Sequence, residues 1–579
     1  MTIMHPRRFP HVTSVTSRTR GLIGAALAFA LGAAPLGAQS RRPAPEFAVA
    51  EATIPQMQAA LREGRTTSRE LVTRYLVRIA TYEDRLNGVA WINARALQEA
   101  DERDRERAAG RIRGPLHGIP VAVKDNIQTR DMPTTGGALA FAGFVPPYDA
   151  TLVQNLRDAG AIILAKTTLT ELANWVAPGM PANYSALFGY SYNPYDPRRD
   201  PRTQLDDGRP VLSTGGSSSG VGTAVSFWAA NVGTETSGSI LSPANQNMLV
   251  GIKPTVGRVS RRGVIPITGD QDTPGPMART VADAAIMLGA LEGARPDTAD
   301  AATRTCARPP RGDYTAFLDS ASLRGARIGV PRAFFFDRFT IPGDSVPRGG
   351  LTGERATLMQ EAISILRARG AVIVDPADIP SVVAPDAQNS FLRWPVCAGV
   401  GDRDCSIAFQ YGMKRDFNAW LRTLGQAAPV ASLKQLREWN LAHRNGGALR
   451  YGQGLLDASD TVDVAVERAR YEADRAKDVR LSATEGIDAV MERYRLDAIL
   501  FPASSGAGIA ARAGYPSIGV PFGFAPNGPA SGFPEGFGAL PTPFGVMFTG
   551  RACSEPRLIG IAYAFEQATR KRVPPPLFP

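Results

Sequence analysis

The feature that most constrains the fold is an order of helix, glycine and apolar strand that recurs along the chain. Thr67 and Glu70 form a capping-box pattern that predicts the start of a helix, with apolar residues following at helical spacing. A second predicted helix ends at Gly160, and the run AIILAK after it predicts a buried strand. The order returns where a helix predicted over residues 354–369 precedes a glycine and the run AVIV. We therefore expect an α/β fold, a single large domain with a mixed β-sheet core covered by helices on both faces.

The first residues have the order of a secretory signal peptide. Four arginines without an acidic residue precede a small apolar run from Gly21 to Ala34, and a small-residue cleavage pattern ends at Ala38. The apolar run is shorter than the about 20 residues that span a bilayer, and an uncleaved anchor is the alternative. We therefore expect residues 1–38 to be removed on export and the protein to be periplasmic or secreted.

The mature chain, residues 39–579, contains no Ser/Gly linker or low-complexity tract, so one domain is expected. Within it we distinguish a motif-rich core at about 110–290, a variable lobe at about 300–480, and C-terminal strands with a helix at about 490–579. In the last part, YPSIGVPFGF and PTPFGVMF predict two strands joined by a long loop.

Charge and cysteine content exclude several classes of protein. Removing the four arginines of the leader lowers the formal net charge from +11 to +7. No block of lysines or interleaved aromatic residues marks a nucleic-acid surface, so we expect a solvated basic face. The four cysteines lack the paired spacing of a zinc site. Cys397 and Cys405 are eight residues apart, and in an oxidising compartment they form either a local disulfide or two free thiols.

The four histidines of the chain limit the choice of a catalytic base, because two of them lie in the leader. A Ser-His-Asp triad would have to use His117 or His443, and neither lies near a G-x-S-x-G nucleophile elbow. Lys124 ends the apolar strand of HGIPVAVKDN. A lysine there is often a solvated charge, but a side chain that points inward is desolvated, which keeps its amine neutral near pH 7.

Two serines stand in glycine-rich surroundings, Ser217 in STGGSSSGVG and Ser239 in GTETSGSI. Each motif alone is also consistent with a plain turn, and the first lacks the lysine–serine pair of a Walker phosphate loop. We expect a helix over about 221–231 after the first motif. The second motif predicts a tight turn that aims several backbone N–H groups into one concavity, a geometry that stabilises an oxyanion. Together with Lys124, the two serines favour a serine hydrolase whose base is an amine.

Six motifs follow one another in order: GPLHGIPVAVKDN, GGSSSG, GTETSGSI, GIKPTVGRVSRRGVIP, QDTPGPMARTVADAA and GRACSEPRLIGIAYAFEQAT. From about residue 50 to the C-terminus the chain resembles the amidase signature family, and within it the bacterial branch that includes peptide amidases. The resemblance implies the amidase signature fold. It also implies that Lys124 and Ser217 relay a proton to Ser239, which forms an acyl-enzyme, and that the peptide bond before Ser217 is cis.

Further roles are implied by the same resemblance. The oxyanion hole is expected from the backbone N–H groups of Thr236, Ser237, Gly238 and Ser239. In the motif TELANW, Ala173 or Asn174 is expected to contact substrate, whereas Leu172 and Trp175 are interpreted as core residues. Asp125 and Asn126 are expected to brace the loop after Lys124, and Asp272 to cap a turn.

The chain departs from the family pattern around the second serine. Ser217 and Ser239 lie 22 residues apart, two fewer than is usual, so the helix between them must be shortened or rewound. The usual ending GGSIR reads SGSIL, with Ser237 in place of glycine or aspartate and Leu241 in place of arginine. Loss of that arginine occurs in the peptide-amidase-like branch and bears on substrate more than on chemistry.

The leader and the resemblance together imply an exported amidohydrolase that cleaves linear carboxamides or C-terminal peptide amides without a metal or cofactor. Its partner would be a small-molecule or peptide amide, with no nucleic acid and no membrane after signal cleavage. The alternatives are an esterase-type hydrolase using the same site, and a catalytically impaired member acting as a binding protein. The family also contains the glutaminase subunit of the tRNA-dependent amidotransferase, but a signal peptide argues against a cytoplasmic tRNA partner.

Overall fold

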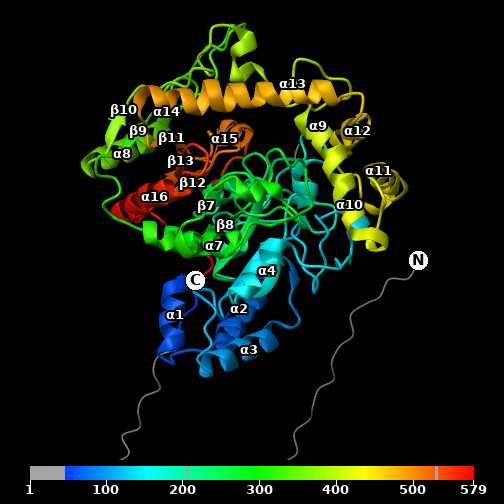
Figure 1. Ribbon diagram of the computed structural model, residues 1–579, viewed down its shortest axis with the longest axis vertical. Coiled ribbons are helices and arrows are strands. Elements are labelled where there is room, and N and C mark those ends of the chain that lie inside the picture. Colours follow the sequence, from blue (N-terminus) through cyan, green and yellow to red (C-terminus); the bar gives the residue numbers. More distant parts are fainter. Residues whose placement is uncertain (1–45, 204–206, 528–531) are drawn as a thin grey trace, which may run out of the picture. The chain divides into compact units, whose positions relative to one another are not determined.

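The structure, a computed structural model, describes residues 46–203, 207–527 and 532–579, so the predicted signal peptide, residues 1–38, lies outside it. An eleven-stranded sheet runs through the described part (Figure 1). Its strands, in spatial order, are β1 (Val89–Ile92), β3 (Ile162–Thr167), β2 (Pro120–Lys124), β6 (Ala230–Glu235), β8 (Thr273–Ala278), β7 (Val250–Lys253), β12 (Ser517–Ala525), β13 (Thr542–Thr549), β11 (Ala498–Pro502), β9 (Arg327–Gly329) and β10 (Val372–Val374). A separate hairpin pairs β4 (Tyr184–Ser185) with β5 (Gly189–Tyr190).

The sheet is mixed, and its parallel part places the candidate residues. β2 is parallel to β3 and to β6, whereas β8, β7, β12 and β13 pair with their neighbours in antiparallel fashion. Because β2 and β6 are parallel neighbours, their carboxyl ends lie at one edge of the sheet. Lys124 is the last residue of β2 and Glu235 the last of β6, so the lysine meets the turn after β6 there. Crevices outside the carboxyl ends of such strands are common ligand sites.

Helices cover both faces of the central strands. α6 (Leu241–Gln246) lies on one face, where a Cβ at Gly251 of β7 would come within 2.6 Å of the Ala244 side chain. Side chains alternate along a strand, so Val250 and Ile252 point to the opposite face. They share the main apolar cluster with residues of α7 (Val281–Glu292) and α16 (Glu555–Thr569), which contact each other and the sheet. The predicted fold class is confirmed.

The helix predicted to begin after Thr67 and the two predicted helix–glycine–strand units are present. Thr67 caps α2 (Ser68–Tyr82), and Glu70 completes the capping box. α4 (Thr151–Asp158) leads through Gly160 into β3, and α8 (Gly353–Ala368) leads through Gly370 into β10. Both glycines have positive φ, 86° and 90°, which glycine adopts without the strain that a Cβ would bring.

The helix predicted over residues 221–231 is much shorter in the structure. α5 spans only Val221–Ala224, and β6 begins at Ala230. The helix ends after one turn, and the Trp228 ring packs onto Gly222, where a Cβ would lie 2.2 Å from the ring. This short helix accommodates the short spacing between the two serine motifs.

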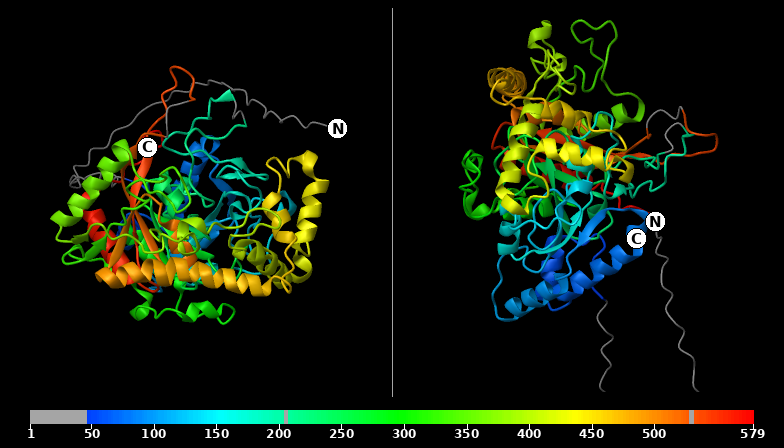
Figure 2. Two further views of the ribbon diagram at one scale, coloured as in Figure 1. Left: turned by 90° about the horizontal axis from the view of Figure 1, so that it is seen from above. Right: turned by 90° about the vertical axis from the view of Figure 1, so that its right-hand side faces the viewer.

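The remaining helices belong mainly to the N-terminal region and to the variable lobe. They are α1 (Ile54–Arg62), α3 (Ala96–Ala108), α9 (Ala408–Gly412), α10 (Asn418–Leu424), α11 (Leu433–Ala442), α12 (Gly454–Asp460), α13 (Arg468–Val479), α14 (Asp488–Tyr494) and α15 (Ala507–Ala513). α9 to α12, coloured yellow, lie together (Figures 1 and 2). An apolar cluster that includes Phe141, Trp175, Phe417 and Trp420 packs these helices against the segment of residues 138–190.

Two disulfides join the four cysteines. Cys397 and Cys405 form the local bond that was one of the two alternatives, and Cys306 pairs with Cys553 across 247 residues. The second bond was not predicted, because nothing in the sequence brings such distant residues together. Among the helices of the described residues, none is both long and apolar enough to cross a bilayer.

Candidate active site

Lys124 lies at the carboxyl end of β2 with its side chain fully buried. Its Nζ lies 2.8 Å from Ser217 Oγ, 2.8 Å from Thr234 Oγ1 and 3.3 Å from the Thr234 carbonyl oxygen. Burial lowers the pKa of Lys124 to about 7, while the negative charges of Asp272 and Glu235 act in the opposite direction. The amine is therefore poised to exchange a proton near neutral pH.

The serine-rich loop carries Ser217 to Lys124 and is fixed on two sides. The Thr170 N–H donates to the Ser217 carbonyl at 3.1 Å, and the Ser218 hydroxyl donates to the Thr234 carbonyl at 3.0 Å. A Cβ at Gly216 would lie 3.0 Å from Ser239 Cα, so the two serine motifs approach backbone to backbone. Glycine is required at this close approach.

The cis peptide bond implied before Ser217 is not found. Among the described residues the one cis bond precedes Pro376, and the bond between Gly216 and Ser217 is trans. A trans bond is favoured by about 3 kcal/mol when the second residue is not proline. The contact between Lys124 and Ser217 forms with this trans bond in place.

Ser239 belongs to the turn of residues 236–239, hereafter the Ser239 turn, which joins β6 to α6. Gly238 has a φ of 81°, in the left-handed region that glycine favours. Glu235 Oε2 accepts the N–H groups of the two residues after Ser239, at 2.7 and 3.0 Å. The four N–H groups of the turn itself donate no hydrogen bond to any described residue. Such a run of unpaired donors has the chemistry of an oxyanion hole.

The Ser239 side chain is 8% exposed, and its hydroxyl forms no hydrogen bond within the described part of the chain. The structure thus brings Lys124 and Ser217 into direct contact and places Ser239 against the backbone of the serine-rich loop. Catalytic hydrogen bonds are often long or unformed in a free enzyme and tighten when substrate binds.

The residues after Lys124 brace the loop, as the sequence predicts. Asp125 pairs with Lys166 at 3.2 Å in the interior and accepts the Thr135 N–H at 3.2 Å. Asn126 Nδ2 donates to Thr234 Oγ1 at 3.0 Å. Thr234 therefore links this loop to the lysine amine, a role that sequence reasoning missed. The signal was its place in the motif of Ser239, on a strand that pairs with β2.

The TELANW motif forms one wall beside the Ser239 turn. Ala173 lines a small cavity there, whereas Asn174 is exposed and is not among the residues lining it. Residues 172–174 have φ values of 43°, 57° and 74°, a left-handed backbone that is strained without glycine and clusters at working sites. Leu172 and Trp175 are buried in the apolar cluster, as predicted.

Neither histidine of the described residues supports a catalytic triad. His117 is buried, with Nε2 2.9 Å from the Arg103 carbonyl oxygen, and His443 is exposed and stacks on a tryptophan ring. Residues Gly216–Gly220 do match the G-x-S-x-G pattern around Ser218. The Ser218 hydroxyl, however, is bonded to the backbone of β6 rather than to an imidazole.

Comparisons with known proteins identify the family. The Amidase family profile matches residues 70–559. A probable amidase of Arabidopsis thaliana is 35% identical over 538 residues, which cover 91% of this chain and 92% of the relative. One component of the glutamyl-tRNA(Gln) amidotransferase of Myxococcus xanthus is 31% identical over 540 residues, which cover 89% of this chain and 96% of the relative.

Solved structures extend the similarity to the fold. The native peptide amidase of Stenotrophomonas maltophilia is 38% identical, with a TM-score of 0.75 over 91% of this chain and 98% of that chain. A complex of the peptide amidase PAM with the competitive inhibitor chymostatin has the same identity and TM-score over 91% of this chain and 99% of that one. The six ordered motifs, the mixed sheet and these similarities together show that the chain belongs to the amidase signature family.

Proposed function

We propose that this chain is an exported amidase that hydrolyses linear carboxamides or C-terminal peptide amides through an acyl-enzyme on Ser239. The observation that carries the proposal is the contact between the buried amine of Lys124, whose pKa is lowered to about 7, and the Ser217 hydroxyl. A base with such a pKa is half neutral near pH 7, which suits general base catalysis at that pH.

The partners of Lys124 favour a neutral amine with its lone pair directed at Ser217. A neutral amine carries two N–H groups and one lone pair. Thr234 offers two acceptors to Nζ, its hydroxyl at 2.8 Å and its carbonyl at 3.3 Å. With both N–H groups directed there, the lone pair is left for the Ser217 proton.

The reaction then follows from the arrangement of the groups. Ser217 gives its proton to Lys124 and accepts the proton of Ser239, whose Oγ attacks the amide carbonyl carbon. The unpaired N–H groups of the Ser239 turn stabilise the negative oxygen of the tetrahedral intermediate. The relay returns a proton to the leaving nitrogen, the C–N bond breaks, and water releases the acid from Ser239 by the same steps in reverse order.

A peptide-like substrate is supported by the similarity to the peptide amidases and by the inhibitor that one of them binds. The side chain at position 241 is a buried leucine, where arginine is common in the family. The chain thus lacks at this position the positive charge that would pair with a substrate carboxylate.

The test is the release of ammonia or amine from simple acyl amides, aryl amides and amidated dipeptides by the purified, folded protein. The matched control is Ser239→Ala, which differs by one oxygen atom. We expect the wild-type protein to hydrolyse at least one of these classes of amide and Ser239→Ala to hydrolyse none of them. Hydrolysis of esters alone would identify an esterase. If the folded protein hydrolyses no substrate, the proposed function is wrong.

Export is supported by the leader sequence and by the two disulfides, which persist in oxidising compartments. Cell fractionation tests it, with the mature protein expected outside the cytoplasm. A cytoplasmic protein bound to a partner would instead favour a role in an amidotransferase, the enzyme for which the Myxococcus xanthus relative is named.

A further inference from the structure

The loop of residues 267–272 holds the Ser239 turn at its first residue. The Thr236 hydroxyl donates to Asp272 Oδ1 at 2.5 Å, and Gln271 Nε2 donates to the Thr236 carbonyl at 3.0 Å. The carbonyl of Thr236 and the N–H of Ser237 belong to one planar peptide unit. Fixing that carbonyl therefore fixes the direction of the Ser237 N–H.

Asp272 is a buried carboxylate whose hydrogen bonds all come from uncharged donors. Besides Thr236, the N–H groups of Ile267 and Thr268 donate to Oδ2 at 2.9 and 3.0 Å. Burial raises the pKa of Asp272 to about 7; Asp416 adds to this effect and Arg261 opposes it. A carboxylate in such a place costs folding free energy, and the turn-capping role alone does not require a charge.

A small cavity brings Asp272 close to the partners of Lys124. The cavity is lined by Asp272, Thr234, Thr236 and Asn126, among other residues. The centre of a water molecule can occupy about 10 Å³ of it, which is enough for one water. Thr234 is the residue that accepts hydrogen bonds from Lys124. Of the two acidic groups that act on the lysine, Asp272 and Glu235, Asp272 has the larger effect.

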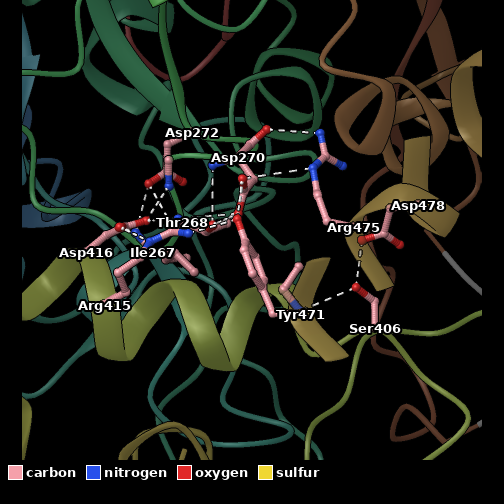
Figure 3. A network of polar contacts seen from close by, with 12 residues as sticks. Ile267, Thr268, Asp270, Asp272, Ser406, Arg415, Asp416, Tyr471, Arg475 and Asp478 are labelled. Atoms are coloured by element: carbon pink, nitrogen blue, oxygen red, sulfur yellow. Dashed lines mark hydrogen bonds and ion pairs between the residues drawn. The ribbon is translucent and has the colours of Figure 1, made fainter. Parts of the chain in front are cut away.

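The outer side of the same loop is held by the variable lobe (Figure 3). The Gly269 N–H donates to Asp416 Oδ2 at 2.7 Å, and the Tyr471 hydroxyl donates to Asp270 at 2.9 Å. Arg415 lies 3.5 Å from Asp270 and 2.8 Å from the Tyr471 hydroxyl. The loop thus has an outer carboxylate, Asp270, that faces the lobe, and an inner one, Asp272, that faces the Ser239 turn.

We propose that Asp272 is a positioning residue of this site: it orients the Ser239 turn through Thr236 and supplies the negative charge that the Lys124 amine feels. The proposal rests on the proposed function, because it assigns Asp272 to the relay of Lys124 and Ser239. A merely structural Asp272 would hold the loop but would leave the protonation of Lys124 unchanged.

The experiment compares Asp272→Asn with Asp270→Asn, which make the same chemical change in one loop. Asp272 faces the Ser239 turn, whereas Asp270 faces the variable lobe. The first readout is the rate at which a fluorophosphonate labels Ser239 between pH 5.5 and 9.5. This labelling can be measured even if the protein hydrolyses no amide. Loss of the Asp272 charge should move the rising limb to lower pH by about 1 unit, the lower end of what a nearby opposite charge produces. Asp270→Asn should leave the limb where it is.

The second readout is the affinity for a peptide aldehyde, whose adduct with Ser239 places an oxyanion at the turn. Asp272→Asn should weaken this affinity at least tenfold, a smaller loss than the about 10²–10³ seen in rate when one oxyanion donor is removed outright. Thr236→Val, which removes the hydroxyl and keeps the Asp272 carboxylate, should weaken the affinity for the aldehyde as well. If Asp272→Asn does not fold, Thr236→Val tests whether the contact between Thr236 and Asp272 orients the Ser239 turn. An unmoved limb in Asp272→Asn, or an unchanged affinity in Thr236→Val, would overturn the proposal.

The two proposals fail in different ways. If the wild-type protein is labelled with a rising pH limb but cleaves no amide, the proposed function is wrong and the shift in Asp272→Asn still decides the role of Asp272. If the wild-type protein is not labelled at all, Ser239 is not an activated nucleophile and both proposals are wrong.

Discussion

Replacing Lys124 by methionine should stabilise the folded protein at neutral pH while it removes the catalytic base. The two side chains are similar in length, but methionine has no amine to ionise in the interior. The lysine side chain is fully buried, and burial lowers its pKa from 10.5 to about 7. Protonation of Lys124 therefore lowers the free energy of unfolding, and the methionine variant, which cannot be protonated there, lacks this loss of stability.

The size of the effect follows from the two pKa values. Each unit of difference corresponds to about 1.4 kcal/mol, so the unfolded chain binds the Lys124 proton more favourably by about 5 kcal/mol. Because the folded pKa is the lower one, this cost is absent above pH 10.5, grows as the pH falls through the window to 7, and is fully present below 7. At every pH the variant loses about 1–3 kcal/mol through the unpaired Ser217 and Thr234 groups. The difference in stability between variant and wild type should thus change by about 5 kcal/mol across the window.

Calorimetry at pH 7 and pH 10.5 measures this change as a shift in Tm. With an unfolding entropy of about 1.2 kcal/mol per kelvin for a chain of this size, 5 kcal/mol corresponds to about 4 °C. The matched control is Lys434→Met, because the Lys434 side chain is 70% exposed and its ammonium is solvated in both states. A Tm difference between Lys124→Met and wild type that is the same at both pH values would refute the lowered pKa and with it the neutral base.

Three further outcomes are expected. Ser239→Ala should abolish covalent labelling by a fluorophosphonate and Ser217→Ala should only slow it; labelling of Ser239→Ala at an unchanged rate would mean that another serine is the nucleophile. Lys124→Ala should lower kcat/KM for amides by about 10²–10⁴ and kcat/KM for matched esters by less, because an amine leaving group needs the returned proton more than an alkoxide does. Equal losses for amides and esters would contradict a relay that protonates the leaving group. Loss of the Cys306 disulfide, which closes a loop of 247 residues, should lower Tm more than loss of the 8-residue Cys397 loop, by roughly 5–6 against 2–3 kcal/mol when converted to free energy, and the opposite order would contradict the chain-entropy argument.

The sequence was sufficient for the fold class, and the reasons are local; the contact between Lys124 and Ser217, which are 93 residues apart, was implied instead by the resemblance to the amidase signature family. Capping boxes and glycine stops are encoded in adjacent residues, as at Thr67 and Gly160. The amine at the end of an apolar strand is desolvated wherever that strand is buried in a sheet, so its lowered pKa follows from the strand assignment. The order of the six motifs indicated which serine lies beside the lysine.

Interactions between distant residues were not predictable in the same way. The contact of Thr236 with Asp272 spans 36 residues and depends on β6 and β8 being antiparallel neighbours, which no local pattern encodes. Asp272 was therefore expected only to cap a turn, and it does accept two N–H groups of its own loop. The pairing of Cys306 with Cys553 was missed for the same reason, since sequence spacing gives no measure of distance in the fold.

The short connection between Ser217 and Ser239 is not evidence against catalysis once the origin of their proximity is clear. β2 and β6 pair in fixed register, Ala122 with Asn231 and Val123 with Val232, so the sheet brings the end of β6 beside Lys124 whatever the length of the connection. The helix in this connection is the single turn of α5. The amine contact and the unpaired N–H groups of the Ser239 turn both survive this shortening. A catalytically impaired binding protein was favoured only by the short spacing, and covalent labelling of Ser239 by a fluorophosphonate would exclude it.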